Sequence, residues 1–103
     1  MTPLCQAAQA ELPIGWADVV HDHVGATVGG VYIEAERRKD RWVVDAWISD
    51  VCLASDPSPT LRDAFGSILS ESAPEPGPGW QPDDLAKRDR ILAVLRGVLE
   101  RAT

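Results

Sequence analysis

The chain has 103 residues and a formal net charge of −6, with 45% apolar and 25% charged residues. These values are typical of a globular protein, and we expect residues 1–103 to form a single domain. The acidic balance disfavours direct binding to nucleic acid or to an anionic membrane, because both need a basic surface. No apolar run approaches the ~20 residues that span a bilayer, and the N-terminus lacks a secretory signal pattern. We therefore expect a cytoplasmic protein.

The N-terminal quarter of the chain predicts two helices. Residues 3–12 are rich in Ala and Gln, and Pro13 should end the first helix. The second helix is predicted over residues 15–24, with Gly25 at the position of a C-terminal glycine cap. Its residues at helical spacing are Trp16, Val19, Val20, His23 and Val24. A strand is the competing interpretation, because valine is β-branched and favours strands.

A β-hairpin over residues 26–49 is the clearest predicted element, with strands 26–36 and 41–49 joined by a charged turn over 37–40. Apolar residues alternate along both strands, as they do where one face of a sheet is buried. The predicted core face carries Val31, Ile33, Ala35, Trp42, Val44, Ala46 and Ile48. The second face carries Tyr32, Glu34, Glu36, Val43, Asp45 and Trp47. Because two strands alone are marginally stable, we expect a further segment such as residues 51–54 to extend the sheet.

Two helices are predicted in the C-terminal half. The first begins either with Ser58 as its N-cap before Pro59 or one step later with a capping box over residues 60–63, and it ends near Glu71. A Pro/Gly-rich loop follows over 72–82, and a final helix runs to the end of the chain. Its apolar stripe includes Leu85, Leu92, Leu95 and Leu99. Such a stripe either covers the chain's own core or pairs two copies in a homodimer.

These elements predict an α+β fold, in which a small antiparallel sheet built on the 26–49 hairpin packs against N-terminal helices and two C-terminal helices. The predicted core residues are Val31, Ile33, Trp42, Val44, Ile48, Leu61, Phe65, Ile68, Leu92 and Leu95.

The second face of the hairpin is the candidate site. Tyr32 and Trp47 share it with Glu34, Glu36 and Asp45. The centres of protein–protein interfaces are enriched in Tyr and Trp, so this mixture is typical of a docking surface. The alternative is that the N-terminal helices cover this face and make Trp47 part of the core.

Other chemistries have weaker support in the sequence. His21 and His23 would chelate one metal ion from a strand but not from the predicted helix, where they point about 200° apart. Cys52 is a candidate nucleophile, but its apolar neighbours indicate a buried, inert thiol. No nucleophile–base arrangement stands out, so we expect neither an enzyme nor a cofactor. The excess of acidic residues also suggests the hypothesis of an acidic nucleic-acid mimic, although Arg and Lys interrupt the acidic residues.

We therefore expect a non-enzymatic protein-binding module. Asn is absent and Arg outnumbers Lys, eight to two, a bias that suits a GC-rich bacterial or phage genome. An inhibitor or adaptor that acts on a larger protein complex is the leading hypothesis. The alternatives are a small metal- or ligand-binding domain or enzyme that uses His21, His23 and Cys52, or the nucleic-acid mimic.

Overall fold

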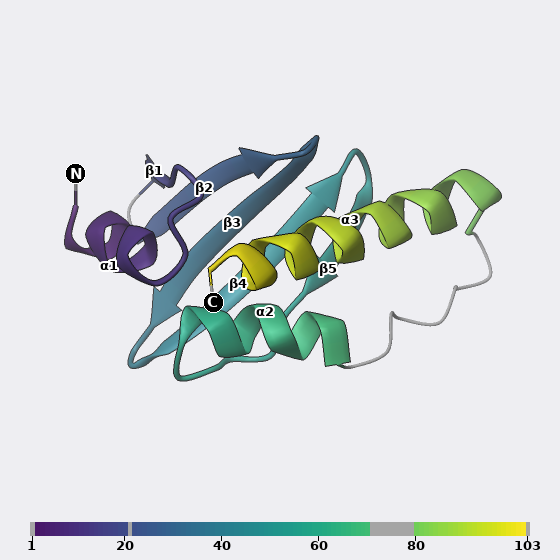
Figure 1. Cartoon of the computed structure of the whole chain (residues 1–103). Helices are drawn as coiled ribbons and strands as arrows, with labels where there is room; N and C mark the ends of the chain where they lie inside the picture. The colour runs from purple at the N-terminus through teal and green to yellow at the C-terminus, as the bar shows by residue number, and fades with distance from the viewer. Residues whose placement is uncertain (1, 21, 71–79, 103) are drawn as a thin grey trace.

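A five-stranded antiparallel sheet in the order β1-β2-β3-β4-β5 forms the centre of the fold (Figure 1). The computed structural model describes residues 2–20, 22–70 and 80–102. In chain order the elements are α1 (Pro3–Glu11), β1 (Ala17–Val20), β2 (His23–Val28), β3 (Val31–Arg38), β4 (Arg41–Ile48), β5 (Val51–Ala54), α2 (Leu61–Ser70) and α3 (Pro82–Arg101). The helices pack on the sheet, so the predicted α+β class is confirmed.

The predicted helix over residues 15–24 is wrong. This segment contains β1 and the start of β2, and Asp22 between them has a φ of 62°. Gly25 is a strand residue of β2 and not a helix cap. The β-branched valines favoured the competing strand interpretation, and pairing of β1 with β2 gives this segment backbone hydrogen bonds that extend the sheet.

The hairpin of β3 and β4 is confirmed, but its first strand is shorter at one end and longer at the other than predicted. Gly29 and Gly30 have φ values of 56° and 83°, and they turn the chain between β2 and β3. The predicted strand 26–36 is therefore two strands. The following turn is narrower than predicted, because β3 continues through Arg38 and leaves Lys39 and Asp40 in the turn. The predicted extension of the sheet by residues 51–54 is confirmed as β5.

The core lies between the sheet and the helices. Eight of the ten predicted core residues are buried, while Ile48 and Leu92 are half-buried against the same cluster. Trp42 is 1% exposed, and the Arg37 guanidinium lies 5.4 Å from its ring centroid. Trp16 is also buried, and its indole Nε1 donates a hydrogen bond of 2.7 Å to the carbonyl oxygen of Leu12.

The start of α2 receives its caps from two places in the chain. The Thr60 hydroxyl accepts from the Asp63 N–H at 3.0 Å, so the cap is Thr60 and the alternative N-cap at Ser58 is wrong. Ser58 is instead buried and pairs with β4 through Trp42. The Glu11 carboxylate accepts from the Leu61 N–H at 3.0 Å, which ties the end of α1 to the start of α2. A carboxylate at this end also suits the helix dipole.

Residues 72–79 of the predicted Pro/Gly-rich loop lie outside the described residues, as does Glu71, the predicted end of α2. Trp80 and Gln81 have no regular structure, and Pro82 already belongs to α3. The Arg90 guanidinium donates to the Gly29 carbonyl oxygen at 2.9 and 3.2 Å, so α3 holds the β2–β3 turn. Among the described residues, no helix is both long and apolar enough to cross a membrane.

Glu11→Ala should lower stability, because it removes the long-range cap of α2. We expect a loss of about 1–2 kcal/mol, which is a fall in melting temperature of roughly 4–8 °C per kcal/mol. Thermal unfolding followed by circular dichroism measures the change. Glu11→Gln keeps one acceptor oxygen and should fall between the wild type and Glu11→Ala. An unchanged melting temperature for Glu11→Ala would contradict this role.

Candidate functional site

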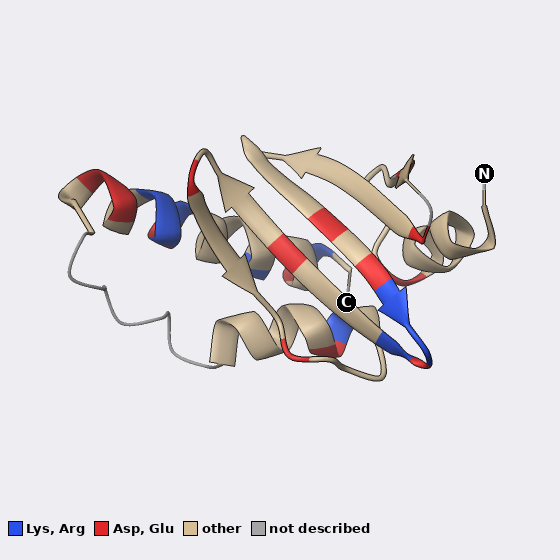
Figure 2. Cartoon of the chain, turned by 180° about the vertical axis from the view of Figure 1, so that it is seen from behind, with Lys and Arg blue, Asp and Glu red and all other residues tan. Residues whose placement is uncertain are grey.

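Among the described residues, no helix packs on one face of the sheet. In β3 and β4 the residues that face α2 and α3 are buried, and those between them are half-buried. Figure 2 shows the sheet from the side opposite α2 and α3, with acidic residues across β3 and β4. We call this surface the open face. It carries His23, Gly25, Tyr32, Glu34, Glu36, Val43, Asp45, Trp47 and Cys52.

The N-terminal segment does not cover the open face. The helix α1 buries Cys5 and Ala8 in the core and contacts α2, which lies on the other side of the sheet. The residues after it form β1, an edge strand in the plane of the sheet. All six residues predicted for the docking surface therefore lie on one open surface, where each is half-buried.

Tyr32 and Trp47 form an aromatic pair on the open face. They are direct cross-strand partners in β3 and β4, which brings their side chains together. Their ring centroids lie 5.8 Å apart with an interplanar angle of 24°, so the rings are stacked. A stacked pair of this kind contributes packing energy beyond its buried area and stiffens both side chains.

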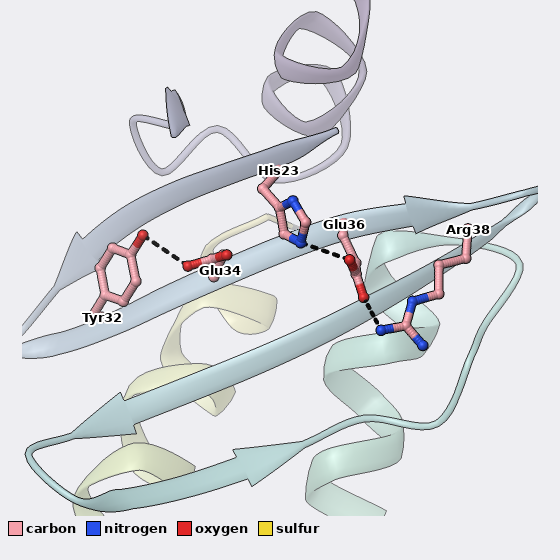
Figure 3. Close-up of polar contacts among 5 residues, drawn as sticks. All are labelled: His23, Tyr32, Glu34, Glu36 and Arg38. Carbon is pink, nitrogen blue, oxygen red and sulfur yellow. Dashed lines mark hydrogen bonds and ion pairs between the residues drawn. The ribbon is translucent and has the colours of Figure 1, made fainter. Parts of the chain in front are cut away.

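Gly25 provides the space in which the Tyr32 hydroxyl lies. A Cβ atom at Gly25 would be 2.5 Å from that hydroxyl oxygen and 2.8 Å from Cγ2 of Val19. The hydroxyl donates a hydrogen bond of 3.1 Å to Oε2 of Glu34 (Figure 3). Loss of hydration raises the pKa of Tyr32, and the hydrogen bond to Glu34 and its negative charge raise it further. Tyr32 therefore remains a hydrogen-bond donor at neutral pH.

The carboxylates of the open face differ in their partners. Glu36 is paired within the chain, because Nε2 of His23 lies 2.6 Å from its Oε2 and a guanidinium nitrogen of Arg38 lies 2.5 Å from its Oε1 (Figure 3). Glu34 and Asp45 are cross-strand partners of each other. Within residues 2–20, 22–70 and 80–102, neither of these two forms a salt bridge.

Asp45 has an unfavourable electrostatic environment. Loss of hydration is the largest cause that raises its pKa, and the negative charges of Glu36 and Glu34 add to it. The positive charge of Arg38 and the nearby His23 oppose this shift without cancelling it. The ionised form of Asp45 therefore opposes folding at neutral pH.

Cys52 lies on the open face and not in the core. Val51 and Leu53 are buried, but the side chain between them points to the other side of β5 and is exposed. The burial predicted for this thiol is wrong, because residues alternate between the two faces of a strand. Partial loss of hydration and the charge of Asp45 still raise the pKa of Cys52, although a backbone hydrogen bond from Ala46 opposes them. The thiol is therefore mostly protonated at neutral pH. Cys5 is buried, and both thiols are free.

The proposed histidine site is not assembled by the described residues. His23 lies on β2 and Cys52 on β5, with β3 and β4 between them. His21 lies outside the described residues. Within the part of the chain that the structure describes, no group of three or more His, Cys, Asp or Glu residues could hold a metal ion.

The leucine stripe of α3 packs toward the chain's own core. Leu95 is buried, and Leu92 and Leu99 are half-buried against the core cluster. Leu85 is half-buried near the start of the helix. The stripe therefore covers β3, β4 and β5, and pairing of two copies through it stays a prediction.

Two valines extend the open face toward the edge of the sheet. Val19 and Val20 are 46% and 62% exposed, and both belong to β1. A groove of about 520 Å³ runs beside them, between β1 and the first residues of the chain. Sequence analysis missed this apolar extension because it placed both valines on a helix. The signal that could have found it is that both residues are β-branched, because β-branched residues favour strands.

Comparison of the chain with protein-family models, with curated proteins and with solved structures finds no match.

Gly25→Ala should destabilise the protein, because the new methyl group would overlap the Tyr32 hydroxyl. We expect a loss of about 1–3 kcal/mol in chemical unfolding, as for other substitutions that overfill a packed site. Gly66→Ala is the matched control, because a Cβ at Gly66 in α2 meets no atom within 4 Å. It should instead stabilise the helix by about 0.5–1 kcal/mol. Tyr32→Phe in the Gly25→Ala background should recover part of the loss, and no recovery would contradict the proposed overlap.

Asp45→Asn should stabilise the protein at neutral pH, because it removes a charge that the fold disfavours. The raised pKa means that folded Asp45 holds its proton more tightly than the unfolded chain does, so its ionisation costs stability above the folded pKa. Since solvent screens this half-buried group, we expect a gain of no more than about 1 kcal/mol at pH 7. The gain should fade as the pH falls toward about 4, where the unfolded carboxyl is also protonated. A pH series of melting temperatures tests this, and a gain that grows on acidification would contradict it.

Proposed function

We propose that this chain is a non-enzymatic protein-binding module that docks onto another protein through its open face. In this proposal it acts in the cytoplasm as an inhibitor or adaptor of a larger protein complex, of bacterial or phage origin. The observation that carries the proposal is the stacked pair of Tyr32 and Trp47, half-exposed on the sheet face opposite α2 and α3.

The surroundings of this pair support a protein partner. Large aromatic side chains at the centre of a surface, with polar groups around them, are the usual energetic centre of a protein interface. The stacking already restricts both rings, so binding would cost less side-chain entropy than binding by two free side chains. Val19 and Val20 add exposed apolar area at one edge of the same surface.

The chemistry of the open face gives less support to catalysis. Its exposed thiol has a raised pKa, which lowers the fraction of thiolate that could act as a nucleophile. The negative charge of Asp45 also raises the pKa of this thiol and so disfavours the thiolate. These observations favour a binding surface over a reactive one.

Trp47→Ala should leave the protein folded and weaken partner binding by at least about 2 kcal/mol, or about 30-fold, the scale of an interface hot spot. A pull-down from a nuclease-treated lysate of a GC-rich bacterium, read by mass spectrometry, would compare it with the wild type. The captured partner would then be titrated against both proteins.

Trp80→Ala is the control for this experiment, because Trp80 is also half-buried but lies before α3 and packs against the core cluster. It should retain the partner. If Trp47→Ala binds as tightly as the wild type, the open face is not the docking surface. If Trp47→Ala unfolds the protein, Trp47 is a structural residue and the proposal is equally wrong.

A further inference from the structure

We propose that the open face binds an arginine side chain of a basic segment in the partner protein. The guanidinium group would lie between the carboxylates of Glu34 and Asp45, against the ring of Trp47. This inference rests on the proposed function and adds the chemical class of the partner to it.

Four side chains would form this subsite, and we call them the quartet: Tyr32, Trp47, Glu34 and Asp45. Tyr32 faces Trp47 across the β3–β4 pair, and Glu34 faces Asp45 one step along it. Cross-strand neighbours are about 5 Å apart, and residues two apart on one strand are about 7 Å apart. A row of two aromatic rings therefore lies directly beside a row of two carboxylates, on one rigid pair of strands.

Charge distinguishes the quartet from the rest of the open face. Two of the chain's own basic side chains lie at Glu36, since His23 and Arg38 are 2.6 and 2.5 Å from its carboxylate, and Arg41 is the exposed cross-strand partner of Arg38 at the end of the same face. The described residues supply no salt bridge to Glu34 or Asp45. Asp45 also has a raised pKa, so its charge is held at a cost to the fold. A cation from a partner would remove this cost on binding.

Arginine fits the quartet better than other cations do. Its planar guanidinium can donate to two carboxylates at once and can stack on an aromatic ring. The ammonium group of lysine is a compact charge without a planar face, so it cannot bridge two carboxylates and stack on a ring in the same way. The same chain already places one arginine over a tryptophan ring, because the Arg37 guanidinium lies 5.4 Å from the ring centroid of Trp42 on the other face of the sheet.

Charge also separates this partner from the other occupants of an open sheet face. A second copy docked face to face would bring the Glu34 and Asp45 carboxylates of both copies onto one surface, and like charges at an interface are strongly unfavourable. Nucleic acid would meet the same carboxylates with its phosphates, against a net charge of −6. A basic segment is the occupant that the charge of the face complements.

A random 12-residue peptide library displayed on phage tests this inference against the immobilised full chain. We expect the selected peptides to be enriched in arginine at one position, at least about fivefold over the starting library. Replacement of that arginine by citrulline, which keeps the shape and removes the charge, should weaken binding at least tenfold. Replacement by lysine should weaken it at least fivefold.

Variants of the protein then show which carboxylates bind the arginine of the peptide. Glu34→Gln and Asp45→Asn should each weaken the selected peptides at least tenfold. Glu36→Gln is the matched control, because it removes an equal charge from a carboxylate that already has partners, and it should change binding less than threefold. Circular dichroism would confirm that all three variants are folded.

The outcomes separate the two proposals. Selected peptides without arginine enrichment, or equal effects of the three acidic substitutions, would overturn the arginine subsite. If the selected peptides in that case bind Trp47→Ala more weakly than the wild type, the docking function of the open face is still supported. Peptides that bind Trp47→Ala as tightly as the wild type, or no selected peptides at all, would contradict both proposals.

Discussion

Packing of helices on only one face of the sheet is the constraint on which the rest of this structure depends. Because side chains alternate along a strand, burying Val31, Ile33 and Ala35 of β3 under the helices forces Tyr32, Glu34 and Glu36 to the other side. The same relation holds along β4. The candidate site is thus the direct complement of the core. A shift of one residue in the register would exchange the two faces, so the core that stabilises the fold also fixes the composition of the open face.

Besides their apolar packing on the sheet, the helices are held in place by charged side chains that bond to the backbone. Glu11 accepts from the start of α2, Arg62 donates to the carbonyl oxygen of Ala102 at 2.7 Å, and Arg90 donates to that of Gly29. Each contact joins segments that are distant in the sequence and satisfies a polar group at the end of a helix or in a turn. Arg62 and Arg90, two of the ten Lys and Arg residues, are therefore used to hold the fold together.

The sequence predicted correctly the strands in which apolar and polar residues alternate strictly. It was misleading where the same residues fit both helical and strand spacing. The β3–β4 hairpin, its two faces and most core residues were predicted, because period-two alternation defines them locally. Trp16, Val19, Val20 and Val24 fit helical spacing by coincidence: Trp16 and Val24 are buried, whereas Val19 and Val20 are exposed. The membership of the open face was also predictable. The pairing of Glu36 with His23, and the space that Gly25 leaves for Tyr32, depend on the register of β2 against β3, which pattern alone does not give.

The carboxylates of the open face have two physical consequences that act together. A half-exposed pair of aromatic rings on a helix-free sheet face would by itself favour association with any apolar surface, including a second copy of the chain. Glu34, Glu36 and Asp45 oppose that association, because desolvating three carboxylates against an apolar or acidic surface is costly. The same groups favour a partner that brings its own positive charge. Under the proposed function, the stability lost at Asp45 would be the cost of keeping the rings available to one class of partner and unattractive to others.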